Sequence, residues 1–132
     1  QNQVLMKRGL LLYQLKNFEA ALKDFSALLS ISDSNTRAHF HTGKVLKQLS
    51  RENDSVLHFE QVIKHNCDEE LTGSALFEIA KIRIKQRDFY EACYNLQRAV
   101  HFQFKSSKFS QYKTFAEGVL FLMKRKAKKG VK

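Results

Sequence analysis

The chain has 132 residues, with 23 Lys and Arg against 13 Asp and Glu, so its formal net charge is +10. That length accommodates one compact domain or a short repeat array, and a composition that is 43% hydrophobic and 27% charged excludes a disordered or collagen-like chain. No apolar run approaches the roughly 20 residues of a membrane span, and no signal peptide is recognisable, so we predict neither.

Two cysteines, Cys67 and Cys93, lie in stretches with helical periodicity and show no CxxC spacing. This arrangement favours free thiols in a reducing compartment. We therefore expect an intracellular protein of the cytoplasm, with the cilium, the cytoskeleton or the nucleus as alternatives. Because the chain begins with Gln1 and ends in a Lys-rich stretch, we also expect it to be part of a longer protein.

One pattern of small and apolar residues occurs three times along the chain with the same internal spacing. Each pattern starts at a small residue and continues 12, 16 and 19 positions later. The sets are Gly9, Ala21, Phe25 and Leu28; Gly43, Ser55, Phe59 and Val62; and Ala80, Ala92, Leu96 and Ala99. The period is 34 residues and then 37, and we assign the extra three residues to a polar loop at 67–73.

Each pattern predicts a pair of antiparallel helices. Small residues recur where two helices would cross most closely, and apolar residues recur at helical spacing. Short polar stretches at 15–17, 50–53 and 86–88 are typical of tight turns inside each pair. Asp33, Ser34 and Asn35 are candidate capping residues before the second pair.

This spacing resembles the tetratricopeptide repeat family, whose units of about 34 residues carry small residues at repeat positions 8, 20 and 27. On that register the repeats cover about 2–35, 36–72 and 73–106. The resemblance implies an all-α, right-handed superhelical solenoid of about seven helices. His39 and Arg83 depart from the apolar pattern of the family. A generic helical bundle remains the alternative, while HEAT and armadillo units of about 40 residues or more fit the 34-residue period less well.

The segment 109–123 predicts a further amphipathic helix, which either closes the array or begins an incomplete fourth repeat at 108–123. Gly118 would then occupy repeat position 8. Between Phe115 and Met123 only Glu117 is charged, which is more apolar than a closing helix requires. The face is therefore also a candidate contact for a partner, for further chain or for self-association.

Catalysis and metal binding find no support in the sequence. It contains no Gly-rich phosphate loop, no GxSxG, no HExxH and no paired-carboxylate arrangement. His39 and His41 would point to different sides of a helix, and His65 with Cys67 has no second ligand pair. We predict a protein that is not an enzyme and that needs no metal or cofactor.

The resemblance implies that the first helix of each pair lines a concave groove. The residues that it places there, our candidate partner-binding site, are Met6, Leu10, Tyr13, Arg37, Phe40, Lys44, Lys47, Phe77, Lys81 and Lys85. Apolar side chains run beside lysines, and none of these positions is acidic. The predicted function is a protein-interaction scaffold or adaptor in a larger complex, binding a peptide or helix with acidic groups and an apolar anchor.

Two alternatives concern the same groove. The lysines would be an ordinary solvated face if Phe40 and Phe77 belonged to the core between repeats. Relatives that clamp the C-terminal carboxylate of heat-shock chaperones use Lys, Asn and Arg side chains for it. All five matching positions differ here, so we do not predict such a clamp; they hold Met6, Leu10, His41, Ser74 and Glu78.

The end of the chain carries much of the net charge. Six cations and no acid lie in 124–132, which leaves 17 basic against 13 acidic residues, or +4, over 1–123. We divide the chain into one domain at 1–123 and a basic tail or linker at 124–132. The tail supports an alternative function, the binding of nucleic acid or another acidic surface. Its cations are Lys124, Arg125, Lys126, Lys128, Lys129 and Lys132.

Overall fold

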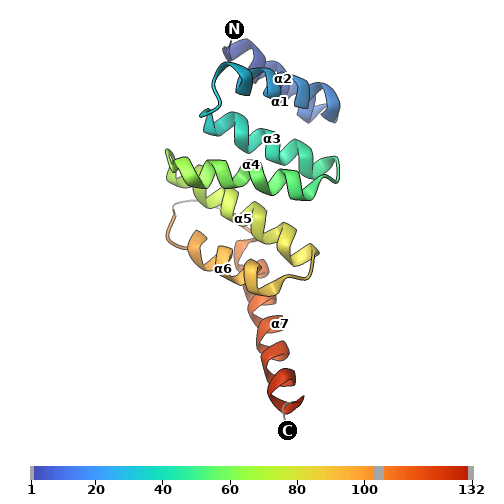
Figure 1. The fold of residues 1–132 in the computed structure, drawn as a ribbon, viewed down its shortest axis with the longest axis vertical. Coiled ribbons are helices and arrows are strands. Elements are labelled where there is room, and N and C mark those ends of the chain that lie inside the picture. Colours follow the sequence, from blue (N-terminus) through green and yellow to red (C-terminus); the bar gives the residue numbers. More distant parts are fainter. Residues whose placement is uncertain (1, 103–105, 131–132) are drawn as a thin grey trace.

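The computed structural model describes residues 2–102 and 106–130, and its regular structure there consists of seven helices, which confirms the predicted all-helical class. Figure 1 shows α1 to α6 stacked in chain order, with α7 running on beyond the stack. No helix in the described ranges is long and apolar enough to cross a membrane. The helices are α1 (Asn2–Gln14), α2 (Phe18–Ile31), α3 (Thr36–Gln48), α4 (Glu52–His65), α5 (Glu69–Lys85), α6 (Phe89–Ala99) and α7 (Phe109–Gly130).

Within the first two pairs, a glycine on one helix faces a buried phenylalanine on the other. A Cβ atom added at Gly9 would lie 2.6 Å from the Phe25 ring. At Gly43 the same atom would lie 2.8 Å from the Phe59 ring. Because real Cβ atoms do not approach so closely, glycine is what allows these helices to pack against a full aromatic ring.

The third pair solves the same packing problem with different residues. Ala80 of α5 and Leu96 of α6 occupy the equivalent positions, and both are fully buried in one core cluster. The branched Leu side chain is smaller than the Phe ring, so a methyl group fits on the facing helix. The sizes of the two facing residues therefore change together from pair to pair.

The turn inside each pair contains one residue with left-handed backbone, at Lys16 (φ 62°), Ser50 (φ 62°) and Arg87 (φ 63°). The backbone N–H that follows donates to a carbonyl of the helix just ended, as from Asn17 to Leu12 at 2.8 Å. This arrangement satisfies carbonyls that the end of a helix leaves unpaired. Turns 15–17 and 86–88 are confirmed, and the middle turn lies at 49–51, slightly earlier than the predicted 50–53.

The predicted cap before the second pair and the three-residue insertion before the third have different outcomes. Asn35 caps α3, because its side chain accepts a hydrogen bond from the Ala38 backbone N–H at 3.1 Å. The prediction that 67–73 is a polar loop is wrong beyond Asp68, because α5 begins at Glu69 and has 17 residues where α1 and α3 have 13. Asp68 caps α5 through the Leu71 N–H, and the acidic first turn favours the helix dipole there. The inserted residues therefore add a turn of helix.

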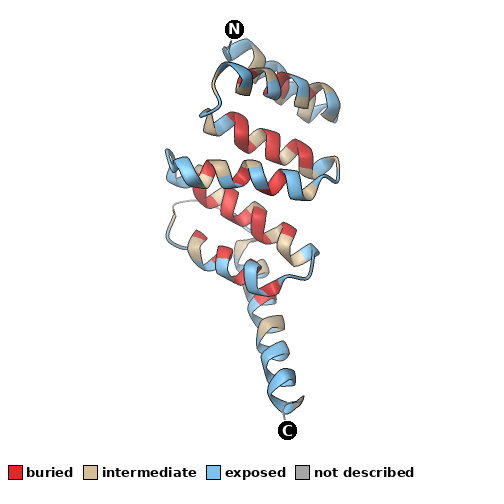
Figure 2. Ribbon diagram, in the orientation of Figure 1, coloured by how far each residue is buried: buried red, intermediate tan, exposed pale blue. Residues whose placement is uncertain are grey.

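The odd-numbered helices form the tighter face of the stack. Helix α1 contacts α3, α3 contacts α5, and α5 contacts α7. Within the described residues α2 does not contact α4, and α4 does not contact α6. We call the side formed by α1, α3 and α5 the inner face, and the spaces between the even-numbered helices the outer gaps. Buried residues are most frequent in α3, α5 and α6 (Figure 2), whereas Gly9 is the one buried residue of α1.

Helix α7 packs through its first half and projects from the stack through its second. Phe109, Tyr112, Ala116 and Leu120 join the core cluster of the third pair. From Phe121 to Lys129 every residue is exposed (Figure 2). The helix continues to Gly130, so 124–130 form its last turns, while Lys132 lies outside the described residues. A Cβ at Gly118 would meet nothing within 4 Å, unlike one at Gly9 or Gly43.

We predict that the glycine and the aromatic ring of a pair are energetically coupled. Gly43→Ala should lower the free energy of unfolding by about 1 kcal/mol, because overpacking outweighs the better helix propensity of alanine. Phe59→Leu should cost a similar amount through lost burial. The double variant reproduces Ala80 with Leu96 and should recover about 1 kcal/mol of the summed loss. Urea denaturation of all four proteins completes the cycle, and strictly additive losses would contradict the close contact.

Candidate peptide-binding face

The inner face brings the predicted site residues of α1, α3 and α5 together. Lys44 of α3 lies over the ring of Tyr13 of α1, with Nζ 5.6 Å from the ring centroid. Lys47 of α3 reaches α5 through an ion pair. Met6 and Arg37 line a shared pocket of about 440 Å³ where α1 and α3 begin. Tyr13, Lys44 and Lys47 thus link α1, α3 and α5 on this face.

Two of the predicted residues form the floor of this surface. Phe40 is 9% exposed and packs in a core cluster with α4 and α5, and Phe77 is 6% exposed and packs with α6 and α7. The rings of Phe109 and Tyr112 also contact the Phe77 ring edge-on, with centroids 5.6 and 5.5 Å away. Helix α7 therefore covers the inner face at the third pair, and what remains open is centred on α1 and α3.

An acidic residue lies among the lysines, although the predicted set contained none. The carboxylate of Glu78 accepts hydrogen bonds from Lys47 Nζ at 2.8 Å and from Lys81 Nζ at 3.1 Å, and its side chain is 13% exposed. Lys85 lies 3.5 Å from a carboxylate oxygen of Glu52. Glu78 matches a chaperone-clamp position, but its pairing with two lysines of the row was missed because residue spacing does not show which side chains meet across repeats.

The Glu78 cluster joins one carboxylate to two lysines through ion pairs of 2.8 and 3.1 Å. Burial alone would raise the pKa of Glu78, but the charges and hydrogen bonds of Lys47 and Lys81 outweigh it and hold this pKa below its usual range. Burial lowers the pKa of Lys81, and Glu78 opposes that shift. The cluster therefore ties α3 to α5 and neutralises part of the predicted basic row.

Lys44 differs from the other three lysines of the row. It has no carboxylate partner within the described residues, and its Nζ stands 5.6 and 5.7 Å from the ring centroids of Tyr13 and Phe40. Rings in this position attract a cation without neutralising its charge. Lys44 is thus the inner-face lysine best placed to meet an anionic group of a ligand.

His41, directly beside this lysine, is a further residue of the face. Its ring stacks on Phe25 with centroids 5.6 Å apart and meets Phe40 edge-on at the same distance. Burial, followed by the charges of Lys44 and Arg37, lowers the pKa of His41 to about 4, so the ring is neutral at pH 7. The contact between His41 and Phe25 was not predicted, because an aromatic contact between helices leaves no local pattern in the sequence.

A second histidine contact supports α3 from its other side. His39 Nε2 donates to the Asp33 carbonyl at 2.7 Å, which leaves its Nδ1 to accept from His58 Nδ1 at 3.1 Å. Burial and the neighbouring His39 lower the pKa of His58. His39 and His41 do point to different sides of α3, and in the described part of the chain no group of three or more His, Cys, Asp or Glu residues could hold a metal ion.

Comparisons with known proteins settle the fold. The structure of the translocator chaperone SycD of Yersinia enterocolitica type III secretion matches with a TM-score of 0.74 and 18% identity over 96% of this chain and 85% of SycD. The fold is that of tetratricopeptide-like helical repeats. SycD in complex with a peptide of the translocator YopD gives a TM-score of 0.75 at 18% identity, covering 95% of this chain and 93% of SycD.

A double mutant of the MamA protein from RS-1 matches with a TM-score of 0.75 and 17% identity, covering 88% of this chain and 64% of MamA. No family model matches the sequence, and no curated protein does. At these identities the similarity establishes a tetratricopeptide-like stack of helix pairs and leaves the ligand to be argued from the surface.

We predict that mild acid destabilises the fold through His41. The unfolded chain binds a proton on this ring near pH 6.5, whereas the folded chain binds it only near pH 4, so stability is present above pH 6.5 and is lost as the pH falls. The loss should reach about 2 kcal/mol at pH 5. Urea denaturation at pH 7.5 and 5 measures it, and His41→Gln should be less sensitive to pH than the wild type. Equal pH dependence in both proteins would contradict the assignment.

Proposed function

We propose that the chain is a non-enzymatic scaffold whose inner face binds a peptide or helix of a partner protein. An acidic group of the ligand meets Lys44, and its apolar side chains contact Met6, Leu10 and Tyr13. The observation that carries the proposal is Lys44, which is held over two aromatic rings with no carboxylate partner in the described residues. Aromatic and basic side chains at the centre of a surface are typical binding hot spots.

The comparisons support this proposal in outline. A protein of the same fold, SycD, has been crystallised with a peptide of its translocator, so this kind of stack can hold a peptide. The pocket of about 440 Å³ beside Met6 and Arg37 offers space for an apolar anchor. The Glu78 network limits the charge that the face can accept, which favours one or two acidic groups over a polyanion. It also disfavours a chaperone C-terminal carboxylate near α5.

We predict that a random peptide library displayed on phage yields ligands with an acidic residue next to apolar ones. Synthetic copies of these peptides, followed by fluorescence anisotropy, should bind Lys44→Glu roughly tenfold more weakly, because attraction becomes repulsion at the centre of the face. Lys23→Glu is the matched control: it makes the same charge change on α2, at an exposed residue away from the inner face. Circular dichroism verifies that both variants are helical. Peptides that bind both variants with wild-type affinity would place the site elsewhere.

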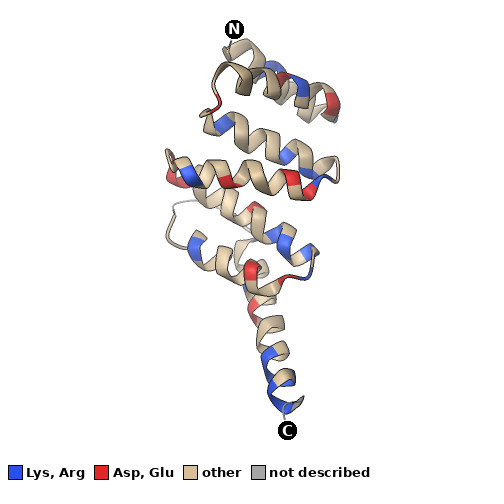
Figure 3. Cartoon of the chain, viewed as in Figure 1, with Lys and Arg blue, Asp and Glu red and all other residues tan. Residues whose placement is uncertain are grey.

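Nucleic acid or another anionic surface is the second candidate ligand, and the end of α7 is the observation that favours it. Figure 3 shows the basic residues concentrated on the last turns of this helix. Lys124 to Lys129 are exposed, and none of the cations there forms an ion pair with a described carboxylate. Three exposed apolar residues, Phe121, Leu122 and Met123, precede them.

We predict that replacing the five described cations of 124–129 by Gln abolishes any binding of single-stranded RNA. In the wild type the logarithm of the association constant should fall with the logarithm of salt concentration by about 0.7 for each phosphate neutralised. Anisotropy of a labelled oligonucleotide at several salt concentrations measures both. Lys44→Glu is the control, and RNA binding that survives the Gln replacements would assign that affinity to another surface.

A further inference from the structure

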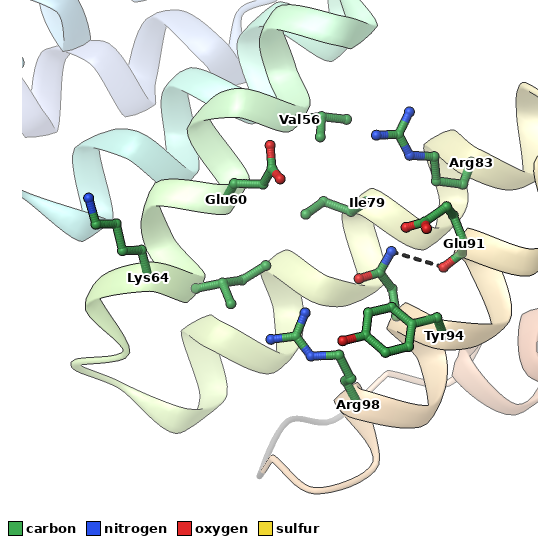
Figure 4. A pocket seen from close by; sticks show the side chains of 10 residues that line it. Val56, Glu60, Lys64, Ile79, Arg83, Glu91, Tyr94 and Arg98 are labelled. Carbon is green, nitrogen blue, oxygen red and sulfur yellow. Dashed lines mark hydrogen bonds between the residues drawn. The ribbon is translucent and has the colours of Figure 1, made fainter.

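The two outer gaps contain pockets built from the same repeat positions. One of about 360 Å³ lies between α2 and α4 over α3, and one of about 300 Å³ lies between α4 and α6 over α5. Figure 4 shows the second, which we call the outer pocket, with side chains from all three helices turned toward it. Because the gaps are equivalent, the first serves as an internal reference for the second.

The two pockets differ in chemistry at equivalent positions. Leu46 of α3 is 3% exposed and closes the floor of the first pocket, and the residue that takes its place in the outer pocket is Arg83 of α5. Leu57 on the rim of the first pocket is replaced by Tyr94. Arg83 is also one of the two departures from the apolar pattern of the repeat. The outer pocket thus has a guanidinium group where the fold itself needs only a leucine.

Arg83 is incompletely paired. Its Nη1 donates to Gln86 Oε1 at 2.9 Å, but its Nε is buried without a hydrogen-bond partner in the described residues. An unpaired buried donor costs about 1–3 kcal/mol, and more when it is charged. Glu60 and Glu91 also line the pocket, yet neither forms an ion pair with Arg83. An acceptor that enters the pocket would satisfy this nitrogen.

The remaining lining suits an acidic side chain of a peptide. Val56, Ile63 and Ile79 supply apolar contact, and Tyr94 is 56% exposed with the Arg98 guanidinium 5.4 Å from its ring centroid. Tyrosine and arginine are the residue types that most often carry binding energy at protein interfaces. The outer pocket can therefore bury the stem of a side chain and donate hydrogen bonds to its end.

The charged residues that line the outer pocket favour a ligand group with one negative charge. Lys64, Arg83 and Arg98 contribute three cations, and Glu60 and Glu91 contribute two carboxylates, so the pocket carries one net positive charge. One carboxylate neutralises this net charge, whereas a phosphate dianion or a nucleic-acid backbone leaves the pocket with excess negative charge. The preference for one carboxylate over a dianion therefore depends on both the cations and the glutamates of the lining.

We propose that the outer pocket is a second binding site, which accepts the carboxylate of one Asp or Glu side chain from an acidic-apolar segment of a partner protein. Arg83 Nε donates a charge-assisted hydrogen bond to the carboxylate, and Arg98 supplies a second donor beside Tyr94. The site is formed by α4, α5 and α6 on the side of the stack away from the inner face. It does not depend on Lys44, so a scaffold with both sites can hold two segments at once.

The test uses the intact chain and two short peptides, the acetylated amide of Ala-Leu-Glu-Leu-Ala and its Gln analogue. Nitrogen-detected NMR follows the Arg Nε–H signals during titration. The Glu peptide should shift the signals of Arg83 and Arg98, and the Gln peptide should leave them in place. Arg83→Leu should weaken binding of the Glu peptide roughly tenfold, and Arg83→Lys should weaken it less because it keeps the charge but loses the fork of donors.

The variants also separate binding from folding. Arg83→Leu introduces the residue type found at the equivalent position of the preceding repeat, Leu46, and it removes a buried unpaired donor. Its urea midpoint should therefore not fall below that of the wild type. Lys44→Glu should bind the Glu peptide at Arg83 as the wild type does. Three results would each overturn the outer site. The Arg83 and Arg98 signals could respond equally to the Glu and Gln peptides, the Glu peptide could bind Arg83→Leu with wild-type affinity, or the signals that shift could all belong to inner-face residues. The last result would leave the proposed inner-face function in place.

Discussion

The close approach of two helices inside each pair is the constraint on which the rest of the structure depends. Gly9 and Gly43 have no Cβ atom, which lets a phenylalanine ring pack directly against the facing backbone. That contact fixes the crossing of the two helices and therefore the direction in which the next pair is added. Ala80 with Leu96 shows that the requirement is for complementary volume and not for a particular residue. The close approach of the two helices in each pair therefore sets the positions of the surface side chains.

The stacking of pairs then gives the two sides of the molecule different chemistry. On the inner side neighbouring helices touch, so side chains of successive repeats meet and form networks such as Lys47, Glu78 and Lys81. On the outer side the even-numbered helices do not contact one another within the described residues, and a pocket lies over the odd-numbered helix in each gap. Inner-face residues are therefore constrained by their neighbours, whereas the floor of an outer gap holds leucine in one repeat and arginine in the next.

The sequence predicted the fold well and the site less well, for a physical reason. Spacing that recurs three times reports the packing of each pair, because the same volumes must meet in each, and it placed the turns and six helices before any coordinates. The extra turn of α5 was not predicted, since the polar residues Glu69, Glu70 and Thr72 suit a helix start as well as a loop. Pairing between repeats depends on side-chain direction, and no periodicity encodes it. Glu78 beside Lys47 and His41 beside Phe25 are therefore visible only in three dimensions.

Within the described residues Gly9 is the one buried residue of α1, whereas α3 has seven. A helix with few buried residues opens at a lower free energy than one with many. Met6, Leu10 and Tyr13 lie on α1, so part of the open inner face belongs to an element that opens more readily than α3. A ligand lying across α1 and α3 would bind only when α1 is docked, and part of its binding energy would be spent in holding the helix there. The affinity of this face and the docking of α1 on α3 are thus governed by one equilibrium.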